Sequence, residues 1–423
     1  MYIPKELTSI ENTRLIGYWN NDQTPVYEVT SVHGLNQIIG YIKHTNADYG
    51  TVLYRGQARL HEKLIPSILH GNPDEKELKK RNKNLKNHVN NILADEKMNT
   101  LLHFDESTNN REFYKRYVAE SMLQHYGVRT HFQDFVDNHW TALWFGLYEL
   151  KKQKMAGSPA SSDFYEYFYE RRNKQYDVAV KSPECLKIKE PVLTQIPSQP
   201  TLYPIIEKSK YTIEDIGDQK NAQIISKIED NETKRAALDQ LIDKDIKEKV
   251  RKNQQLMDAW QKKCASIKMS NDSLIEKYKL DQESNTAYVY ILLYVADTRG
   301  ENFKGVYAGT ETITIDLRKA LPSVLIRPCA QHGWTVSRIG VISDLSDGVV
   351  CVLRLTVELV DKMMGEGLLV QPENFFPPAE IDNGYKILLG RENVQPFGSP
   401  IKKYPRDLPS IFPFGAIQHF KHK

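Results

Sequence analysis

The sequence predicts an α+β protein whose mixed sheet is flanked by helices and interrupted by a large, charged, helical insertion. Three observations lead to this fold class. Apolar runs typical of buried strands occur at 51–57, and again much later at 287–297 and 348–359. Apolar helices follow the first of these strands. Between the two groups of strands, residues 151–285 are rich in charge and carry apolar residues only at spaced positions. We therefore expect one core built from two separated pieces of chain.

Residues 1–50 form a short mixed lead-in to that core. The alternation in "TPVYEVTSV" predicts a strand, and the spacing in "HGLNQIIGYIKHT" predicts a helix. The strand at 51–57, "TVLYRGQ", ends in a glycine turn. A helix is then expected to open at Asn72, with Pro73 at its first position.

This helix is basic. The stretch from Asp74 to Lys86 carries six Lys or Arg residues against three acidic ones. A solvated helix face explains such a run more simply than a nucleic-acid surface, although the pattern fits either.

The first part of the core, 51–150, contains two further helices. Residues 112–124 and 139–150 have apolar residues at helical spacing, and Trp140 and Trp144 belong in the core. Between these helices lies "LQHYGVRTHFQDF", which brings two histidines, an arginine, a threonine and an aspartate into a turn. A connection held by two rigid elements is well placed for chemistry.

The insertion at 151–285 is expected to be mainly helical, and an antiparallel helical pair would suit its length and charge. No sustained heptad is present, which argues against a long coiled coil. Residues 286–423 then complete the core and add a C-terminal tail, with "TITIDL" as a shorter strand between the two long ones.

Composition narrows the class of protein. The 423 residues have a net charge of +3 and are 40% hydrophobic and 26% charged, as expected for a soluble globular chain without a marked nucleic-acid signature. No apolar run reaches the ~18 residues of a membrane span, and the first residues lack a signal-peptide core. The four cysteines are too scattered for a disulfide framework or a zinc cluster. We therefore expect a cytoplasmic protein.

Three stretches, taken together, resemble the FRG domain, a bacterial family named for its Phe-Arg-Gly signature. They are "YRGQARLHEKLIPSIL", the polar turn continued as "LQHYGVRTHFQDFVDNHWTALWFG", and "RPCAQHGWTV". The similarity covers 54–150 and extends to 287–340, so residues 51–150 are the first part of an FRG-like core. Three residues differ from those usual in the family at the matching positions, namely Arg129, His131 and His139. The matching residues are Tyr54, Arg55, Gly56, Gln57, Gln124, His125, Tyr126, Gly127, Thr130, Asp134, Arg327, Gln331, Gly333 and Trp334.

This family is linked to phage defence and toxin-like roles. The order of motifs is also similar to the arginine class of ADP-ribosyltransferases. In those enzymes, a strand-end arginine holds NAD, a polar motif before an apolar helix lines the nicotinamide pocket, and a later strand brings a carboxylate or glutamine to the reacting sugar. The resemblance implies an ADP-ribosyltransferase-like fold with NAD as substrate.

It also implies roles for individual residues. The catalytic candidates are Arg55, His125, Asp134 and Gln331, and the candidates for binding NAD are Tyr54, Arg55, Gly56, Gln57, Gln124, Tyr126 and Thr130.

The chemistry of these side chains agrees with such roles. The planar fork of Arg55 suits a pyrophosphate, and Gly56 allows a ligand to approach the backbone. A carboxylate would stabilise the sugar cation, and Asp134, Glu358 and Glu373 are the candidates. His125 titrates near neutral pH and would bind ribose or act as a base. Tyr126 and Trp334 offer flat faces to a base.

Structural explanations compete with each role. Arg55 and Asp134 would also make a buried ion pair, and Gln124 and His125 would also cap the preceding helix. Tyr126 fits a core position as well as a ligand contact, and for Trp334 a core position is the favoured explanation. A metal held by His125, His131 and Asp134 is a weaker alternative, since a second ligand cluster is missing.

The leading functional prediction is a toxin-like or phage-defence effector that consumes NAD and transfers ADP-ribose to a protein or to RNA or DNA. A neutralising antitoxin-type protein is an expected partner. One alternative is a non-catalytic module that senses a nucleotide or a phage component, and another is a metal-dependent nuclease. The sequence contains no Gly-x-Ser-x-Gly elbow, which argues against a Ser/His/Asp hydrolase. It also lacks a glycine-rich phosphate loop, which argues against a nucleotide-binding protein of that type.

Overall fold

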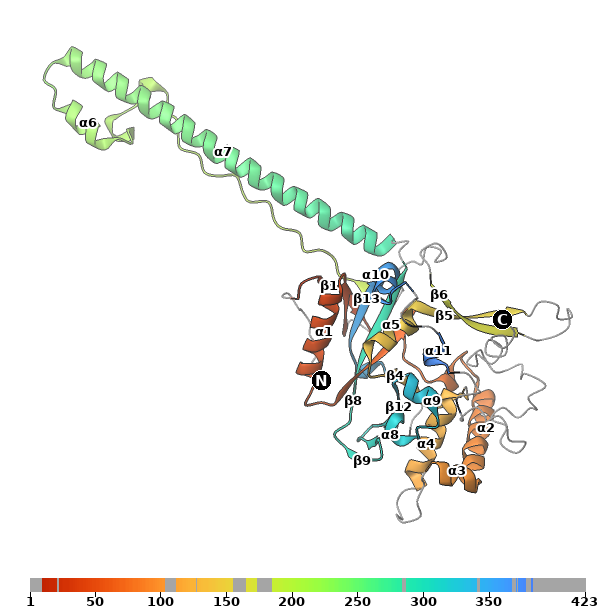
Figure 1. The fold of residues 1–423 in the computed structure, drawn as a ribbon. Coiled ribbons are helices and arrows are strands. Elements are labelled where there is room, and N and C mark those ends of the chain that lie inside the picture. Colours follow the sequence, from red (N-terminus) through yellow and green to blue (C-terminus); the bar gives the residue numbers. More distant parts are fainter. Residues whose placement is uncertain are drawn as a thin grey trace. The chain divides into compact units, whose positions relative to one another are not determined.

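The three strands predicted at 51–57, 287–297 and 348–359 are neighbours at the centre of one sheet in the computed structural model (Figure 1). The structure describes residues 10–20, 23–102, 112–126, 128–154, 165–172, 185–283, 287–340, 343–366, 370, 372–377 and 382. The predicted helix stop at Gly127 lies outside these residues. The chain divides into two units, 1–189 with 282–423 and 190–281.

The main sheet of the first unit has eleven strands in the order β7-β1-β2-β13-β8-β3-β4-β12-β11-β10-β9. It is a mixed sheet, because β13 runs parallel to β2 while the other pairs of described strands are antiparallel. This confirms the α+β class. The strands are β1 (Thr13–Trp19), β2 (Thr24–Val29), β3 (Thr51–Gln57), β4 (Gln133–Val136), β7 (Lys187–Ile188), β8 (Tyr288–Ala296), β9 (Glu301–Phe303), β10 (Val306–Ala308), β11 (Thr312–Asp316), β12 (Gly333–Arg338) and β13 (Val349–Thr356).

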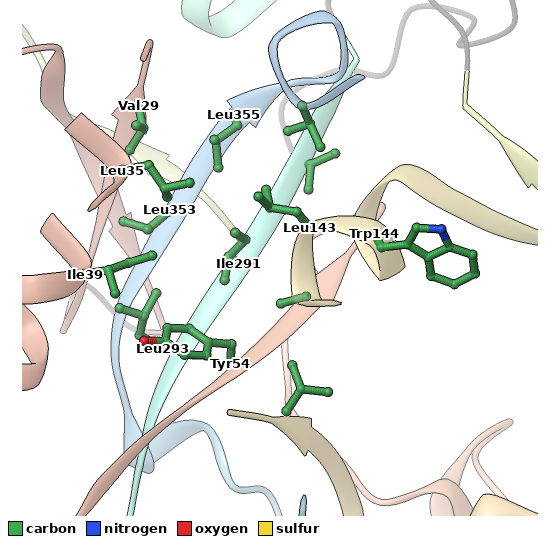
Figure 2. Packing of buried hydrophobic residues seen from close by; sticks show 14 of the residues in the cluster. Val29, Leu35, Ile39, Tyr54, Leu143, Trp144, Ile291, Leu293, Leu353 and Leu355 are labelled. Atoms are coloured by element: carbon green, nitrogen blue, oxygen red, sulfur yellow. The ribbon is translucent and has the colours of Figure 1, made fainter. Parts of the chain in front are cut away.

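Helices α1 (Val32–Thr45) and α5 (His139–Leu147) pack against the central strands. Ser31 caps α1 by accepting a hydrogen bond from the Gly34 amide at 3.0 Å. Figure 2 shows Leu143 of α5 beside Ile291 of β8 and Leu35 of α1 beside Leu353 of β13, within one buried cluster. Because β8 is buried along nearly its whole length, it has the continuous apolar sequence of a strand covered on both faces.

A second layer consists of α2 (Glu75–Ala94), α3 (Glu96–Leu101) and α4 (Glu112–His125), which lie together in Figure 1. The predicted start of α2 at Asn72 is wrong. Asn72 has a positive φ of 47°, which a helix does not admit, and the Asp74 side chain caps the helix instead by accepting from the Glu77 amide at 2.7 Å. The first helical residue is therefore Glu75, two positions after Pro73.

The C-terminal part of the first unit adds short helices around the sheet, α8 (Leu317–Ala320), α9 (Ile326–Ala330), α10 (Val357–Met363) and α11 (Pro372–Phe375). The helix predicted over 139–150 ends at Leu147, because the chain continues as β5 (Tyr148–Lys154), which pairs with β6 (Tyr165–Arg171). These two strands fall in the stretch predicted to be a mainly helical insertion.

The second unit, 190–281, contains α6 (Gln219–Ser226) and most of α7 (Asn231–Glu283). The predicted antiparallel helical pair does not extend along this unit, because the eight-residue α6 packs on only a short part of α7, through Ala222, Leu241 and Ile242. Instead, an extended segment, 190–206, lies along the single long helix α7 (Figure 1). We call this segment the strap. Its four prolines exclude the interior of a helix, which explains why helical spacing could not predict its course. No helix among the described residues is long and apolar enough to cross a membrane.

Candidate functional site

The main sheet opens between β3 and β4. Within the described strands, these two are paired only at Tyr54 and Val136. Beyond that point, Arg55 and Gly56 pair with β8 on one side, and Asp134 pairs with β12 on the other. The Arg55 side chain reaches across the opening, where Nη1 donates to the main-chain oxygen of Asp134 at 2.7 Å.

A cavity of about 220 Å³ lies at this opening. Its polar wall is formed by side chains that come from four different elements of the chain. Aromatic rings of Phe135, Phe145 and Phe376 complete the lining. The four residues predicted as catalytic from the sequence, Arg55, His125, Asp134 and Gln331, all line it.

His125 is the last residue of α4 and is only 5% exposed. Its Nδ1 atom lies 3.2 Å from Gln331 Oε1, and its Nε2 atom faces Asp134 Oδ1 at 3.6 Å. Both Nε2 and Oδ1 are buried without a hydrogen-bond partner. Gly333 makes room for the ring, because a Cβ atom there would lie 3.0 Å from His125 Cε1.

Burial lowers the pKa of His125 below its ordinary value. The charge of Asp134 and the hydrogen bond to Gln331 oppose this effect without cancelling it, and the charge of Arg327 adds to it. The imidazole is therefore neutral at neutral pH. Burial also lowers the pKa of Arg55, against the opposing charge of Asp134, but an arginine keeps its proton at neutral pH.

Arg327, on α9, is a second arginine at the cavity. It is 3% exposed, and its guanidinium carbon lies 4.6 Å from the centre of the Phe376 ring. Arg327 belongs to the motif "RPCAQHGWTV", but the sequence predicts no role for it. The spacing in the sequence could have indicated that Arg327 lines the same site as Gln331, because the two are four residues apart and so share one helix face. Phe145 was missed because it lies in an apolar helix whose sequence looks like core throughout.

The predicted NAD-binding residues fall into two groups. Tyr54, Gly56 and Gln124 line the cavity. Gln57 lies beside it and, with its amide turned to suit its neighbours, accepts from Arg55 Nε at 3.1 Å. Thr130 and Tyr126 do not line the cavity and instead support its walls. The Thr130 hydroxyl donates to Gln124 Oε1, and the Tyr126 hydroxyl donates to the buried Asp382 carboxylate at 3.1 Å.

The predicted flat face for a base is therefore wrong for Tyr126, whereas Trp334 has the core position that was favoured for it. Tyr126 is fully buried in the cluster between α2 and α4. Trp334 is 5% exposed and stacks on Tyr307, with 5.9 Å between ring centres. The role predicted for Gly56 also changes. A Cβ atom at this position would lie 1.6 Å from the Ala142 carbonyl oxygen, so the glycine is needed for the close approach of α5 to β3.

Two of the competing structural explanations are wrong in the described residues. Arg55 bonds to the carbonyl of Asp134 and forms no ion pair with its carboxylate. Gln124 and His125 do not cap α4 with their side chains, which bond to Thr130 and Gln331.

His131 and Glu358, the other described candidates for a ligand or a carboxylate, do not line the cavity. His131 Nδ1 is 2.9 Å from Glu120 Oε1, and its Nε2 is 2.8 Å from Asn82 Oδ1, so it does not join His125 and Asp134. No group of three metal-ligating residues occurs in the described part of the chain. Glu358 is exposed and pairs with Lys362 at 3.1 Å, and the Glu373 side chain lies outside the described residues.

Comparison with known families agrees with the motifs. Residues 50–155 match the family model described as the FRG domain. The chain carries an FRG domain. The FRG domain supplies Arg55, His125 and Asp134, whereas Arg327 and Gln331 come from beyond the matched residues. The cavity is thus completed by the later part of the chain. Neither the curated proteins nor the solved structures gave a match.

Proposed function

We propose that the cavity binds NAD and that the protein cleaves it and transfers ADP-ribose to a macromolecular acceptor. The observation that carries this proposal is the convergence of Arg55, His125, Asp134 and Gln331 on one cavity. A purely structural network would pair its buried polar atoms with one another. At this site, His125 Nε2 and Asp134 Oδ1 face each other unbonded, which favours a ligand as the missing partner.

The size and charge of the site support a dinucleotide that is only partly enclosed. Ligand pockets for drug-sized molecules occupy ~300–1,000 Å³, so a cavity of about 220 Å³ would hold one end of NAD. The guanidinium of Arg55 would bind a phosphate by bidentate hydrogen bonding, and Arg327 adds a second positive charge.

In the proposed reaction, the bond between the ribose C1′ and the nicotinamide nitrogen breaks, and nicotinamide leaves with the bonding electrons. Asp134 stabilises the positive charge that develops on the sugar. The acceptor then donates an electron pair to C1′, and its proton passes to His125. A neutral imidazole is suited to this step, and burial keeps His125 neutral by lowering its pKa.

The order of the motifs supports an ADP-ribosyltransferase-like fold. Arg55 lies on β3, the Thr130–Asp134 motif precedes α5, and Gln331 precedes β12. This is the order expected from the resemblance of the sequence. Such an activity suits a toxin-like or phage-defence effector, which needs a neutralising antitoxin-type partner in its own cell.

We assign recognition of the acceptor or of that partner to the second unit. Charged residues cover much of α7, and apolar side chains of the unit are exposed, among them Val192 at 82% and Met269 at 74%. An exposed apolar surface with a charged rim is typical of a macromolecular interface. Replacement of Val192, Ile196 and Met269 by serine should weaken acceptor or partner binding while NAD cleavage continues.

The test of the reaction is incubation of the full-length protein with NAD and measurement of free nicotinamide. Release by the wild type and by Arg59→Ala, together with loss in Arg55→Ala, would support the proposal, because Arg59 is an exposed arginine outside the cavity. Binding of NAD without release would favour the non-catalytic sensing module. Nucleic-acid cleavage that stops on addition of a chelator, without nicotinamide release, would favour the nuclease.

A further inference from the structure

The side-chain amide of Gln331 bridges two groups whose chemistry fixes its orientation. Its Nε2 atom lies 3.0 Å from the main-chain oxygen of Phe375, and its Oε1 atom lies 3.2 Å from His125 Nδ1. A main-chain carbonyl only accepts hydrogen bonds, so the NH₂ end of the amide must face Phe375. The carbonyl end therefore faces the imidazole.

This orientation determines which ring nitrogen of His125 carries the proton. Because Gln331 Oε1 has no hydrogen, Nδ1 must donate to it, and a neutral imidazole has only one N–H group. We infer that Gln331, anchored on the Phe375 carbonyl, holds His125 in the Nδ1–H tautomer, so that Nε2 presents a lone pair to the cavity beside Asp134 Oδ1. Gln331 is then a positioning residue, because it acts on a ligand through His125.

The consequence is a pair of neighbouring hydrogen-bond acceptors that the protein leaves unsatisfied. His125 Nε2 and Asp134 Oδ1 are 3.6 Å apart, which is too long for a mutual hydrogen bond, and both are buried. A ligand group that satisfies both must donate two hydrogen bonds, as an amide NH₂ or a pair of neighbouring hydroxyls does. A group without donors would leave two buried acceptors unpaired and would be rejected.

The ligand part of this inference rests on the proposed function, in which two ribose hydroxyls or the carboxamide NH₂ of NAD would occupy the position. The tautomer does not depend on NAD. The charged groups that face the ring in the described residues are Asp134 and Arg327. Asp134 lies 3.6 Å from Nε2, beyond hydrogen-bond length, whereas Gln331 lies within it at Nδ1, so the hydrogen bond to Gln331 selects the protonated nitrogen.

Nuclear magnetic resonance of the full-length protein, labelled with ¹⁵N at histidine, measures the tautomer directly. We expect the Nδ1 signal of His125 at the position of a protonated nitrogen and the Nε2 signal at that of an unprotonated one, at a pH where the ring is neutral. The signals are assigned by their absence from His125→Gln. A protonated Nε2 in the wild type would overturn the inference.

Two variants test the part played by Gln331. Gln331→Glu keeps an acceptor for Nδ1–H and should retain the tautomer, with the pKa of His125 raised by the added charge. Gln331→Leu removes the acceptor, and the ring should shift toward the Nε2–H form, with nicotinamide release reduced at least ~10-fold. Gln261→Leu, at an exposed position of α7, is the matched control and should change neither readout. If Gln331→Leu fails to fold, the wild type and Gln331→Glu still decide the matter.

The outcomes for the two proposals are separable. A wild type that releases no nicotinamide but has the Nδ1–H tautomer would contradict the proposed function and leave the role of Gln331 intact. A wild type that releases nicotinamide and has the Nε2–H tautomer would overturn the role of Gln331 alone. A Gln331→Leu variant with an unchanged tautomer would also overturn it.

Discussion

The guanidinium of Arg55 bonds to the main-chain carbonyl of Asp134, at 2.7 Å, and leaves the Asp134 carboxylate to face His125. This arrangement places a cation at the mouth of the opened sheet without neutralising it. A ligand phosphate can therefore share the guanidinium with the carbonyl, since the planar fork has five donors. The carboxylate stays ready to act on a second part of the ligand.

The first prediction concerns Arg55→Ala. Nicotinamide release should fall at least ~100-fold, as for the loss of an electrostatic catalytic group. The free energy of unfolding should fall by only ~1.5–3 kcal/mol, the value of a charged hydrogen bond, since no buried carboxylate loses an ion-pair partner. Chemical denaturation beside the activity assay measures both. Arg55→Lys should rescue little, because a point charge lacks the fork. If Asp134→Asn stabilised Arg55→Ala by more than it stabilises the wild type, an ion pair between the two side chains would be indicated, contrary to this account.

The second prediction concerns Asp134→Asn. An amide at this position can donate to His125 Nε2, where the carboxylate and the lone pair now face each other as two acceptors. We expect the free energy of unfolding to rise by ~0.5–1.5 kcal/mol while nicotinamide release is lost. Denaturation at pH 8, where the imidazole is neutral, measures the first effect.

Asp137→Asn provides the matched comparison three residues further on. The Asp137 carboxylate accepts a hydrogen bond from Arg318 and lies 3.3 Å from His332 Nδ1, so its neutralisation should lower stability. If Asp134→Asn proved the more damaging of the two to stability, the unsatisfied acceptor pair would not exist.

The third prediction is a pH dependence set by His125. Burial lowers its folded pKa below the ordinary value of 6.5, so between the two values the unfolded chain binds a proton that the folded chain does not. The contribution of His125 to the free energy of unfolding is therefore fully present above pH ~6.5 and is lost as the pH falls below this value. The free energy of unfolding of the wild type, relative to His125→Gln, should decrease between pH 7.5 and 5.

Subtraction of the variant isolates this histidine. The pKa values of His61, His70, His88 and His139 are also lowered by burial, but they contribute equally to both proteins. A difference that grows as the pH falls would mean that the pKa of His125 is raised by Asp134, contrary to the prediction.

The fourth prediction compares two glycines. Gly56→Ala would place a Cβ atom 1.6 Å from the Ala142 carbonyl oxygen, and a main-chain group cannot move aside as a flexible side chain does. The free energy of unfolding should fall by ~3 kcal/mol or more. Gly40→Ala, in α1, meets nothing within 4 Å and should stabilise the protein by ~0.5–1 kcal/mol. Thermal unfolding of both variants checks the contrast, and equal effects would refute it.

The sequence could predict the elements that are local or strongly apolar. The central strands and α5 follow from continuous apolar runs, because burial on both faces leaves little room for polar residues. The polar turn also led to His125 and Asp134, and the Tyr-Arg-Gly stretch led to Arg55. Their convergence depends on the opening between β3 and β4, which no spacing in the sequence encodes.

The errors have the same origin. Tyr126 was assigned to a ligand because an aromatic ring beside polar residues has the same sequence signature in a cavity as in a core. Gly56 was assigned to a ligand because only tertiary structure shows that α5, and not a bound molecule, occupies the space of its missing Cβ. Asn72 looked like a helix cap until its positive φ excluded it.

The last prediction concerns the strap of the second unit, which two asparagines of α7 hold by its backbone. Asn271 accepts from the Thr194 amide at 3.0 Å and donates to its carbonyl at 2.9 Å. Asn253 does the same for Tyr203, at 2.7 and 2.9 Å. Each side chain therefore replaces the two hydrogen bonds that a neighbouring strand would supply.

The spacing of these anchors fixes the conformation of the strap. From residue 253 to 271, the helix rises ~27 Å at ~1.5 Å per residue. From 194 to 203, a polyproline II segment extends ~28 Å at ~3.1 Å per residue. Because the two lengths agree, we expect both asparagines to act together and the prolines of the strap to keep it extended.

Removal of one anchor should therefore loosen its own end of the strap. In Asn253→Ala, the amide of Tyr203 should exchange its hydrogen at least ~10-fold faster, since it loses its acceptor, while Thr194 changes less. Asn271→Ala should reverse this order. Hydrogen exchange followed by mass spectrometry measures both sites, and Gln261→Ala on exposed α7 surface is the control. Unchanged exchange at Tyr203 in Asn253→Ala would mean that other contacts, such as the hydrogen bond from Trp260 Nε1 to the Pro197 carbonyl at 3.0 Å, hold the strap instead.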